Sequence, residues 1–211
     1  MESTLRRGAG APRLTLIETL GWDGSRFLRL ELHLARLAGS AARLGWRCDQ
    51  DGVRQALQDA VSPTPARVRL TLDARGGFKV SIAAMPAPAM LWRVGLAAPR
   101  LSSSDPWLAI KSSNRTAYDT ARATLPESLD EVIFQNERGE VCDGTITTVF
   151  FDAGDGLCTP PLSSGLLPGV LRAEMLAKDA LREAVLRASD LDKVRLWVGN
   201  SLRGLIPAQV S

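Results

Sequence analysis

Histidine and cysteine are scarce in this chain, and their scarcity excludes several kinds of site. The only histidine is His33, so a metal site or a Ser–His or Cys–His catalytic pair would have to use that residue. The three cysteines, Cys48, Cys142 and Cys158, are odd in number and widely spaced, which predicts neither a disulfide framework nor a zinc site. We therefore expect no metal and a reducing, cytoplasmic setting.

Long apolar runs and aromatic side chains are also missing. No segment approaches the roughly 18 consecutive apolar residues of a membrane span, and residues 1–7 are not followed by the apolar run of a signal peptide. Aromatic residues make up 5% of the chain, and its basic residues are scattered singly among acids, which disfavours nucleic-acid binding. The net charge of +3 suits a small anionic substrate. We expect no nucleic-acid or membrane partner.

The remaining composition is that of an ordinary globular protein, with 45% hydrophobic and 23% charged residues. Alternating apolar residues predict strands over 13–22, 68–72 and 78–82. Short segments next to turns predict further strands over 91–97, 131–134, 140–142, 147–151, 157–159 and 194–198. Helical spacing predicts helices over 30–44, 51–60, 116–123 and 170–186. On the first helix, His33 is most simply a packed or capping residue.

The order of these elements predicts the fold class and the domains. Strands mostly follow one another through hairpin turns, which favours an α+β fold with antiparallel-rich sheets over a doubly wound parallel sheet. Residues 99–107 contain prolines and serines typical of a linker. We therefore expect an N-terminal α+β subdomain over 1–98 and a C-terminal subdomain over 108–211.

Lys111 and Asp143 are the most informative pair of residues. A partly desolvated lysine has a lowered pKa and can form an imine with an aldehyde. Pyridoxal phosphate needs such a lysine, together with a carboxylate that keeps its ring nitrogen protonated and a cradle for its phosphate. Taken alone, however, Lys111 is more often a surface lysine and Asp143 a turn residue.

Several short segments in a fixed order strengthen the interpretation. They are residues 16–20, 33–37, 111–115, 136–145, 159–162, 165–172 and 200–204. Together they resemble the class IV aminotransferase family, the fold-type IV pyridoxal phosphate enzymes. The resemblance implies a D-amino acid aminotransferase-like fold of two small subdomains, pyridoxal 5'-phosphate as the cofactor and, by analogy, a homodimer.

The resemblance also implies roles for individual residues. Lys111 corresponds to the Schiff-base lysine, which also moves the substrate proton, and Asp143 stands where the family has a glutamate beside the pyridine nitrogen. The residues implied in phosphate binding are Arg36, Gly169, Val170, Leu171, Asn200 and Ser201. In isolation Arg36 would be a solvated helix residue, and the other positions simple turns. Thr148 and Leu171 depart from the family's frequent asparagine and threonine.

Within the family, the chain looks most like the 4-amino-4-deoxychorismate lyases, because Lys111 and Arg115 are followed by Tyr118-Asp119. This branch implies conversion of 4-amino-4-deoxychorismate to 4-aminobenzoate and pyruvate, a reaction of folate biosynthesis. Thr19 is a candidate for assisting proton transfer. Arg115 and Arg203 are candidates for substrate carboxylate contacts, with structural ion pairing as the alternative.

Two other functions remain open from the sequence. The first is a class IV transaminase that acts on branched-chain or D-amino acids, since it would use the same Lys111, Arg36 and Asp143. The second is a degenerate, non-catalytic family member, which the joint departures at Asp143, Thr148 and Leu171 suggest.

Overall fold

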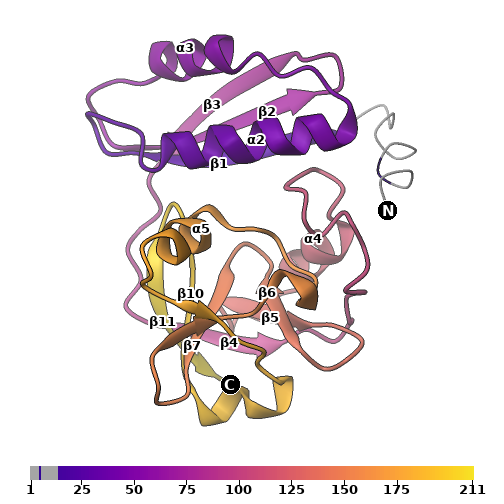
Figure 1. The fold of residues 1–211 in the computed structure, drawn as a ribbon. Helices are drawn as coiled ribbons and strands as arrows, with labels where there is room; N and C mark the ends of the chain where they lie inside the picture. The colour runs from indigo at the N-terminus through magenta and orange to yellow at the C-terminus, as the bar shows by residue number, and fades with distance from the viewer. Residues whose placement is uncertain (1–4, 6–13) are drawn as a thin grey trace. The chain divides into compact units, whose positions relative to one another are not determined.

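The computed structural model describes Leu5 and residues 14–211, and the chain divides into two compact units (Figure 1). The first comprises the chain up to Ala87 together with Ile110–Asn114, and the second comprises Pro88–Ala109 with Arg115–Ser211. Both units combine helices with mainly antiparallel sheets. The predicted α+β class with antiparallel-rich sheets is therefore confirmed.

The first unit is a three-stranded antiparallel sheet with two helices. Its strands are β1 (Thr15–Trp22), β2 (Ala66–Asp73) and β3 (Phe78–Ala84), in the order β1-β2-β3. Helix α2 (Leu30–Leu44) packs on β1, and α3 (Gln50–Ala60) packs on β3. Alternation along β2 buries Val68, Leu70 and Leu72 and leaves Arg67 and Arg69 exposed, as the period of a half-buried strand requires. Residue 13 of the first predicted strand lies outside the described residues.

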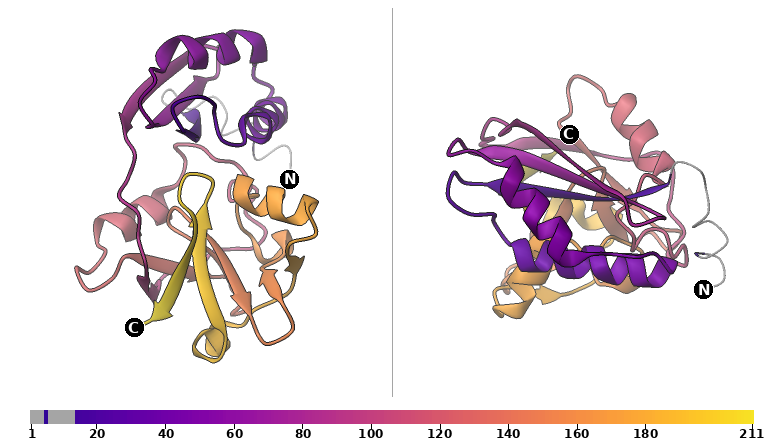
Figure 2. Two further views of the ribbon diagram at one scale, coloured as in Figure 1. Left: turned by 90° about the vertical axis from the view of Figure 1, so that its left-hand side faces the viewer. Right: turned by 90° about the horizontal axis from the view of Figure 1, so that it is seen from above.

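The second unit is built on a larger, closed sheet. Its strands are β4 (Trp92–Leu96), β5 (Glu131–Gln135), β6 (Val141–Gly144), β7 (Thr148–Asp152), β8 (Leu157–Thr159), β9 (Arg182–Glu183), β10 (Arg195–Asn200) and β11 (Gly204–Val210). They pair in the order β10-β11-β4-β5-β6-β7-β8-β9, and β10 also pairs with β7, so that β10, β11, β4, β5, β6 and β7 form a ring. Figure 2 shows β10 and β11 side by side as a hairpin near the carboxyl end.

Short helices and a buried core complete the second unit. The helices are α4 (Thr116–Ala123) and α5 (Val170–Ala177), with 3-10 turns at Leu162–Ser164 and Ala188–Lys193. A core cluster of this unit includes Ile133, Val141, Val149 and Val198, each with less than 1% of its surface exposed. Burial of these apolar side chains is the main driving force for closing the sheet. The ring thereby gives the loops at its strand ends a rigid support.

The boundaries between the units differ from the predicted subdomains 1–98 and 108–211. Residues from 88 onward join the second unit, because β4 pairs with β5 and β11. The predicted linker 99–107 also belongs there, since Leu101 N donates to Gln135 O at 2.9 Å. Residues 110–114 instead join the first unit, because Ile17 N donates to Lys111 O at 2.8 Å. Backbone pairing between distant segments decides these boundaries.

The predicted helix over 170–186 is wrong beyond Ala177. Asp179 adopts a left-handed conformation with φ 53°, Asp179 N donates to Leu176 O, and Ala180 N donates to Met175 O. This pattern is a Schellman helix end, which usually has glycine at the left-handed position. Because aspartate stands there, the sequence carries no glycine stop signal. The chain then extends into β9, and β11 was not predicted at all.

We expect Asp179→Gly to stabilise the protein by about 0.5–1 kcal/mol, because glycine adopts the left-handed conformation without a steric cost. Urea denaturation measures the change. Lys178→Gly is the matched control, since Lys178 has φ −98° and its replacement by glycine should destabilise the helix end by a similar amount. Equal or reversed effects of the two substitutions would contradict the assignment of the helix end.

Candidate active site

Backbone hydrogen bonds to the edge of β1 fix the position of Lys111. Ile17 N donates to Lys111 O at 2.8 Å, Ser113 N donates to Thr15 O at 2.9 Å, and Leu16 forms an isolated bridge with Ser112. The side chain of Lys111 is half-buried. The segment therefore extends the sheet of the first unit, and Lys111 sits on a rigid edge.

A buried acid pairs with two basic side chains in the same unit. The carboxylate of Glu18, on β1, accepts hydrogen bonds from Arg36 Nε at 2.8 Å and Arg36 Nη2 at 2.6 Å, and His33 Nδ1 lies 2.6 Å from its Oε2. Burial acts to raise the pKa of Glu18, but Arg36 and His33 outweigh it and lower this pKa to about 2. Glu18 thus fixes the guanidinium of Arg36, the predicted phosphate ligand.

The positive charge of Lys111 also acts on this cluster. Burial lowers the pKa of His33, and the positive charges of Arg36 and Lys111 lower it further against the pull of Glu18. His33 is therefore a buried, paired residue of α2 rather than a helix cap. Thr19, the next residue of β1 after Glu18, points to the opposite face of the strand and is half-buried. Arg36 and Lys111 together make this part of the first unit suitable for an anion.

Asp143 is a buried acid of β6 in the second unit. Its Oδ1 accepts a hydrogen bond from Tyr118 Oη at 3.0 Å, and its Oδ2 accepts one from Leu167 N at 3.2 Å. Burial raises the pKa of Asp143 to about 7, even though both hydrogen bonds act in the other direction. The carboxyl group is therefore poised between its neutral and ionised forms at neutral pH.

The turn that follows Asp143 is built around a second buried acid. Glu131 Oε1 accepts hydrogen bonds from Thr145 N at 3.0 Å and Thr145 Oγ1 at 2.5 Å, and Oε2 accepts from Ile146 N and Thr147 Oγ1 at 3.1 and 3.0 Å. A side chain at Gly144 would collide with Glu131 and Thr147. Glu131 therefore determines how the chain leaves Asp143.

Arg115 contacts protein groups of the second unit. Its Nη2 donates to Thr145 O at 2.5 Å, its Nε donates to Asp119 Oδ1 at 2.8 Å, and its guanidinium lies 5.3 Å from the centre of the Tyr118 ring. These contacts support structural ion pairing as the role of Arg115. Its contact with a substrate carboxylate stays a prediction.

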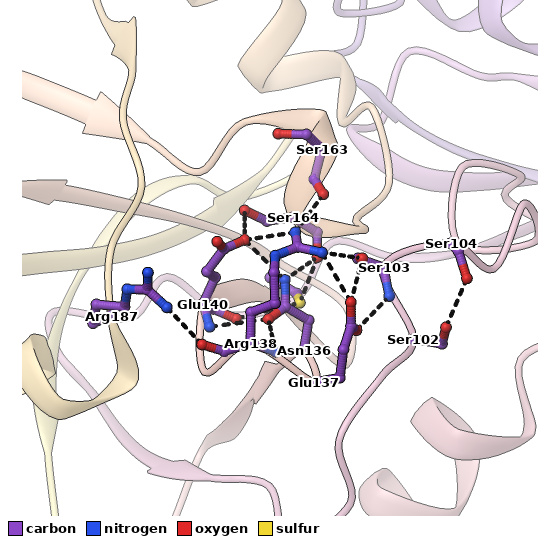
Figure 3. Close-up of polar contacts among 11 residues, drawn as sticks. Ser102, Ser103, Ser104, Asn136, Glu137, Arg138, Glu140, Ser163, Ser164 and Arg187 are labelled. Carbon is purple, nitrogen blue, oxygen red and sulfur yellow. Dashed lines mark hydrogen bonds and ion pairs between the residues drawn. The ribbon is translucent and has the colours of Figure 1, made fainter.

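A polar network anchors the loop that supplies the Leu167 amide (Figure 3). Asn136 Nδ2 donates to Ser164 O at 2.9 Å, and Arg138 Nη2 donates to Ser163 O at 2.8 Å. Glu140 Oε2 accepts from Asn136, Arg138 and Ser164. The turn 136–139 thereby holds the loop 160–169 in place.

The start of α5 has the shape of a phosphate cradle. Gly169 is its N-cap, and a Cβ there would lie 2.5 Å from Thr148 Oγ1, so the backbone must approach closely without a side chain. The first N–H groups of a helix have no acceptor within the helix, and they attract anions. Val170 and Leu171 supply such groups, while the Leu171 side chain packs in the core beside Phe150. At Leu171, the backbone N–H is suited to binding phosphate and the side chain is not.

The predicted second phosphate turn is organised by Asn200. Its Nδ2 donates to Ile146 O at 3.1 Å, and its Oδ1 accepts from Leu202 N and Arg203 N at 3.0 Å each. Ser201 is buried beside it. The Arg203 guanidinium lies 5.2 Å from the centre of the Trp92 ring. Asn200 thus connects this turn to the turn that follows Asp143.

The predicted site residues are divided between the two units. Lys111, Arg36 and Thr19 belong to the first unit, and the other predicted residues belong to the second. Glu18, Tyr118 and Glu131 were not predicted as site residues. Their roles depend on partners 14 to 25 residues away in sequence, as the contacts from Glu131 to Thr145 and from Tyr118 to Asp143 show. An acid within an apolar strand is a signal that could have pointed to Glu18 and Glu131, whereas Tyr118 on α4 has no such signal.

Residues 14–211 contain no group of three or more histidine, cysteine, aspartate or glutamate side chains arranged to hold a metal ion. No helix in the described part of the chain has the length and apolar character needed to cross a membrane.

Comparison with known proteins gives a consistent result. The sequence model of the family described as amino-transferase class IV matches residues 15–210. A protein from Schizosaccharomyces pombe, provisionally named an aminodeoxychorismate lyase, is 32% identical over 180 residues, which are 80% of this chain and 75% of that protein.

Solved structures resemble the chain over nearly its whole length. A provisionally named amino-acid aminotransferase from Mesorhizobium loti is 47% identical with a TM-score of 0.89, over 94% of this chain and 100% of that one. A provisionally named 4-amino-4-deoxychorismate lyase from Legionella pneumophila has a TM-score of 0.79 at 20% identity, over 93% of this chain and 82% of that one. The latter likeness shows the fold.

We expect Asp143→Asn to change how stability depends on pH in the protein without bound ligand. The folded-state pKa of about 7 lies above the ordinary 3.8, so the contribution of Asp143 to stability is full below about pH 4 and is lost as pH rises through 7. The variant should lack this loss and melt roughly 2–6 °C higher than the wild type at pH 8.

Thermal melts from pH 4 to pH 9 measure the difference. Asp192→Asn, at an exposed aspartate, is the control and should follow the wild-type curve. Parallel curves for Asp143→Asn and the wild type would show that Asp143 is not titrating near neutral pH.

We expect Glu131→Gln to destabilise the protein by about 2–4 kcal/mol, because the amide places a donor where two buried donors need an acceptor. Urea denaturation tests this expectation. Glu127→Gln, at an exposed position close in sequence, should change stability by less than about 0.5 kcal/mol. A similarly small effect at Glu131 would mean that the turn does not depend on its carboxylate.

Proposed function

Because the chain belongs to the class IV aminotransferase family, which consists of pyridoxal phosphate-dependent enzymes, we propose that it converts 4-amino-4-deoxychorismate to 4-aminobenzoate and pyruvate. The observation that carries this choice is the relative from Schizosaccharomyces pombe, which shares 32% identity over 80% of the chain and is named for this activity. The reaction belongs to folate biosynthesis, and we expect a cytoplasmic homodimer. Membership of an enzyme family argues against the non-catalytic alternative.

The residues present fit the cofactor. The cradle at Gly169, which any side chain would fill, suits a phosphate, and so does Arg36, which Glu18 holds in place. Asp143 offers a buried carboxylate with unused lone pairs to a protonated ring nitrogen. Lys111 offers the amine that would bind the aldehyde group of the cofactor covalently. When bound, the cofactor supplies an electron-withdrawing ring.

Side chains of the protein carry out the other steps. In the proposed lyase, the Lys111 amine removes the ring proton of the substrate as a general base. The bond from the ring carbon to the ether oxygen then breaks, the side chain leaves as enolpyruvate, which becomes pyruvate on taking up a proton, and the ring becomes aromatic. Thr19 relays a proton to the departing group, and Arg115 and Arg203 contact the carboxylates of the anionic substrate. These roles extend the sequence predictions.

A second function is a transaminase, and a specific observation favours it. The structure from Mesorhizobium loti, 47% identical to this chain, is named an amino-acid aminotransferase. Such an enzyme would use Lys111, Arg36 and Asp143 in the same way, but it would transfer the amino group of a branched-chain or D-amino acid to a 2-oxo acid. The two reactions differ in products, so one set of assays separates them.

We expect the purified protein with pyridoxal phosphate to release pyruvate and 4-aminobenzoate from 4-amino-4-deoxychorismate. Lys111→Ala should reduce the rate at least about 10³-fold, because the nucleophile and base are both removed. Lys178→Ala, at an exposed lysine paired with Glu174, should leave the rate unchanged. Pyruvate is measured by coupling to lactate dehydrogenase.

Parallel assays offer branched-chain and D-amino acids with 2-oxoglutarate and measure glutamate. Glutamate formation without pyruvate release, by protein that holds the cofactor, would replace the lyase with the transaminase.

A further inference from the structure

The side chain of Asp143 is shorter than that of a glutamate, and it has a hydrogen-bond partner on α4. We propose that Tyr118, the only tyrosine of the chain, is a positioning residue that keeps Asp143 ionised and oriented for the cofactor ring. The inference rests on the proposed role of Asp143 and adds a residue to it. Tyr118 Oη donates a hydrogen bond to Asp143 Oδ1 at 3.0 Å.

The Tyr118 ring is held rigidly. It meets the edge of Phe134 at 5.0 Å between ring centres, and the Arg115 guanidinium lies over it at 5.3 Å. Arg115 is itself tied to Asp119 and to Thr145 O. The hydroxyl therefore cannot follow a moving carboxylate, and the carboxylate must take the orientation that the hydroxyl dictates.

Tyr118 and Leu167 together determine which lone pairs of Asp143 remain. A carboxylate has about four lone-pair positions, and the hydroxyl and the Leu167 amide use one on each oxygen. One lone-pair position on each oxygen is therefore left for a further donor. A fixed direction matters more for aspartate than for glutamate, because the shorter side chain has one fewer rotatable bond with which to correct its aim.

Electrostatics gives the hydroxyl a second effect. Burial and the negative charge of Asp143 raise the pKa of Tyr118, so it stays a phenol and a donor at physiological pH. Burial already brings the pKa of Asp143 to about 7 with both donors in place. Loss of the Tyr118 donor raises that pKa further, since hydrogen bonds to the charged form favour it. A neutral Asp143 cannot hold a protonated ring nitrogen.

The test substitutes Tyr118→Phe, which keeps the ring and its packing. We expect the dissociation constant for pyridoxal phosphate, measured by its absorbance and fluorescence, to rise about 10- to 100-fold at pH 8 and by less at pH 6, where Asp143 is protonated in both proteins. Thr124→Val is the matched control, because it removes a hydroxyl at the end of the same helix that bonds only to Thr120 O. It should bind the cofactor like the wild type.

A second experiment measures how stability depends on pH in the protein without cofactor. In the ligand-free protein, the loss of stability that follows ionisation of Asp143 should move to higher pH in Tyr118→Phe, and the variant should be less stable than the wild type at pH 9. An unchanged pH midpoint together with unchanged affinity would overturn the proposal for Tyr118.

A double-mutant cycle separates this proposal from the role of Asp143 itself. Tyr118→Phe should weaken cofactor binding in the wild type and have little effect in the Asp143→Asn background. If Asp143→Asn binds cofactor normally, the proposed role of Asp143 fails. If Asp143→Asn loses affinity but Tyr118→Phe does not, or if both losses are additive, Asp143 keeps its role and only the inference about Tyr118 is wrong.

Discussion

A carboxylate taken out of water must receive hydrogen bonds from the protein, and the described structure depends on how three buried acids meet this requirement. Glu18 is paired with the Arg36 guanidinium and the His33 imidazole, and its pKa falls to about 2. Glu131 receives four donors from the turn that it organises. Asp143 receives only a phenol and one amide, and its pKa stays near 7. The first two acids are structural supports, whereas the third keeps capacity for another partner.

Each element around Asp143 is fixed by a contact outside the site. The Glu131 carboxylate shapes the turn that follows, and Asn200 joins that turn to the end of β10. The polar network of Figure 3 holds the loop that carries the Leu167 amide. Asp143 is therefore set in a closely supported frame, and Tyr118 on α4 donates a hydrogen bond to its side chain.

Ordered motifs in the sequence predicted the family and its cofactor, because the turns and charged groups expected to hold pyridoxal phosphate occupy short, recognisable segments. The same motifs left both a lyase and a transaminase open, since both proposed reactions would use Lys111 and Arg36 in the same way. They also gave no site role to Glu131, or to Tyr118, which served only as part of the motif that favours the lyase branch. A single tyrosine on a helix and a glutamate at the start of a strand have no local feature that names their partners.

Local periodicity by itself determined α2 over Leu30–Leu44, α4 over Thr116–Ala123 and the β2–β3 hairpin, because apolar spacing and turn residues act over a few positions. Only tertiary structure decided the end of α5, the strand β11 and the attachment of residues 110–114 to the first unit. These features depend on hydrogen bonds between segments far apart in sequence. The ionisation of Asp143 belongs with them, because burial and the distant Tyr118 hydroxyl, rather than its neighbours along the chain, determine its pKa.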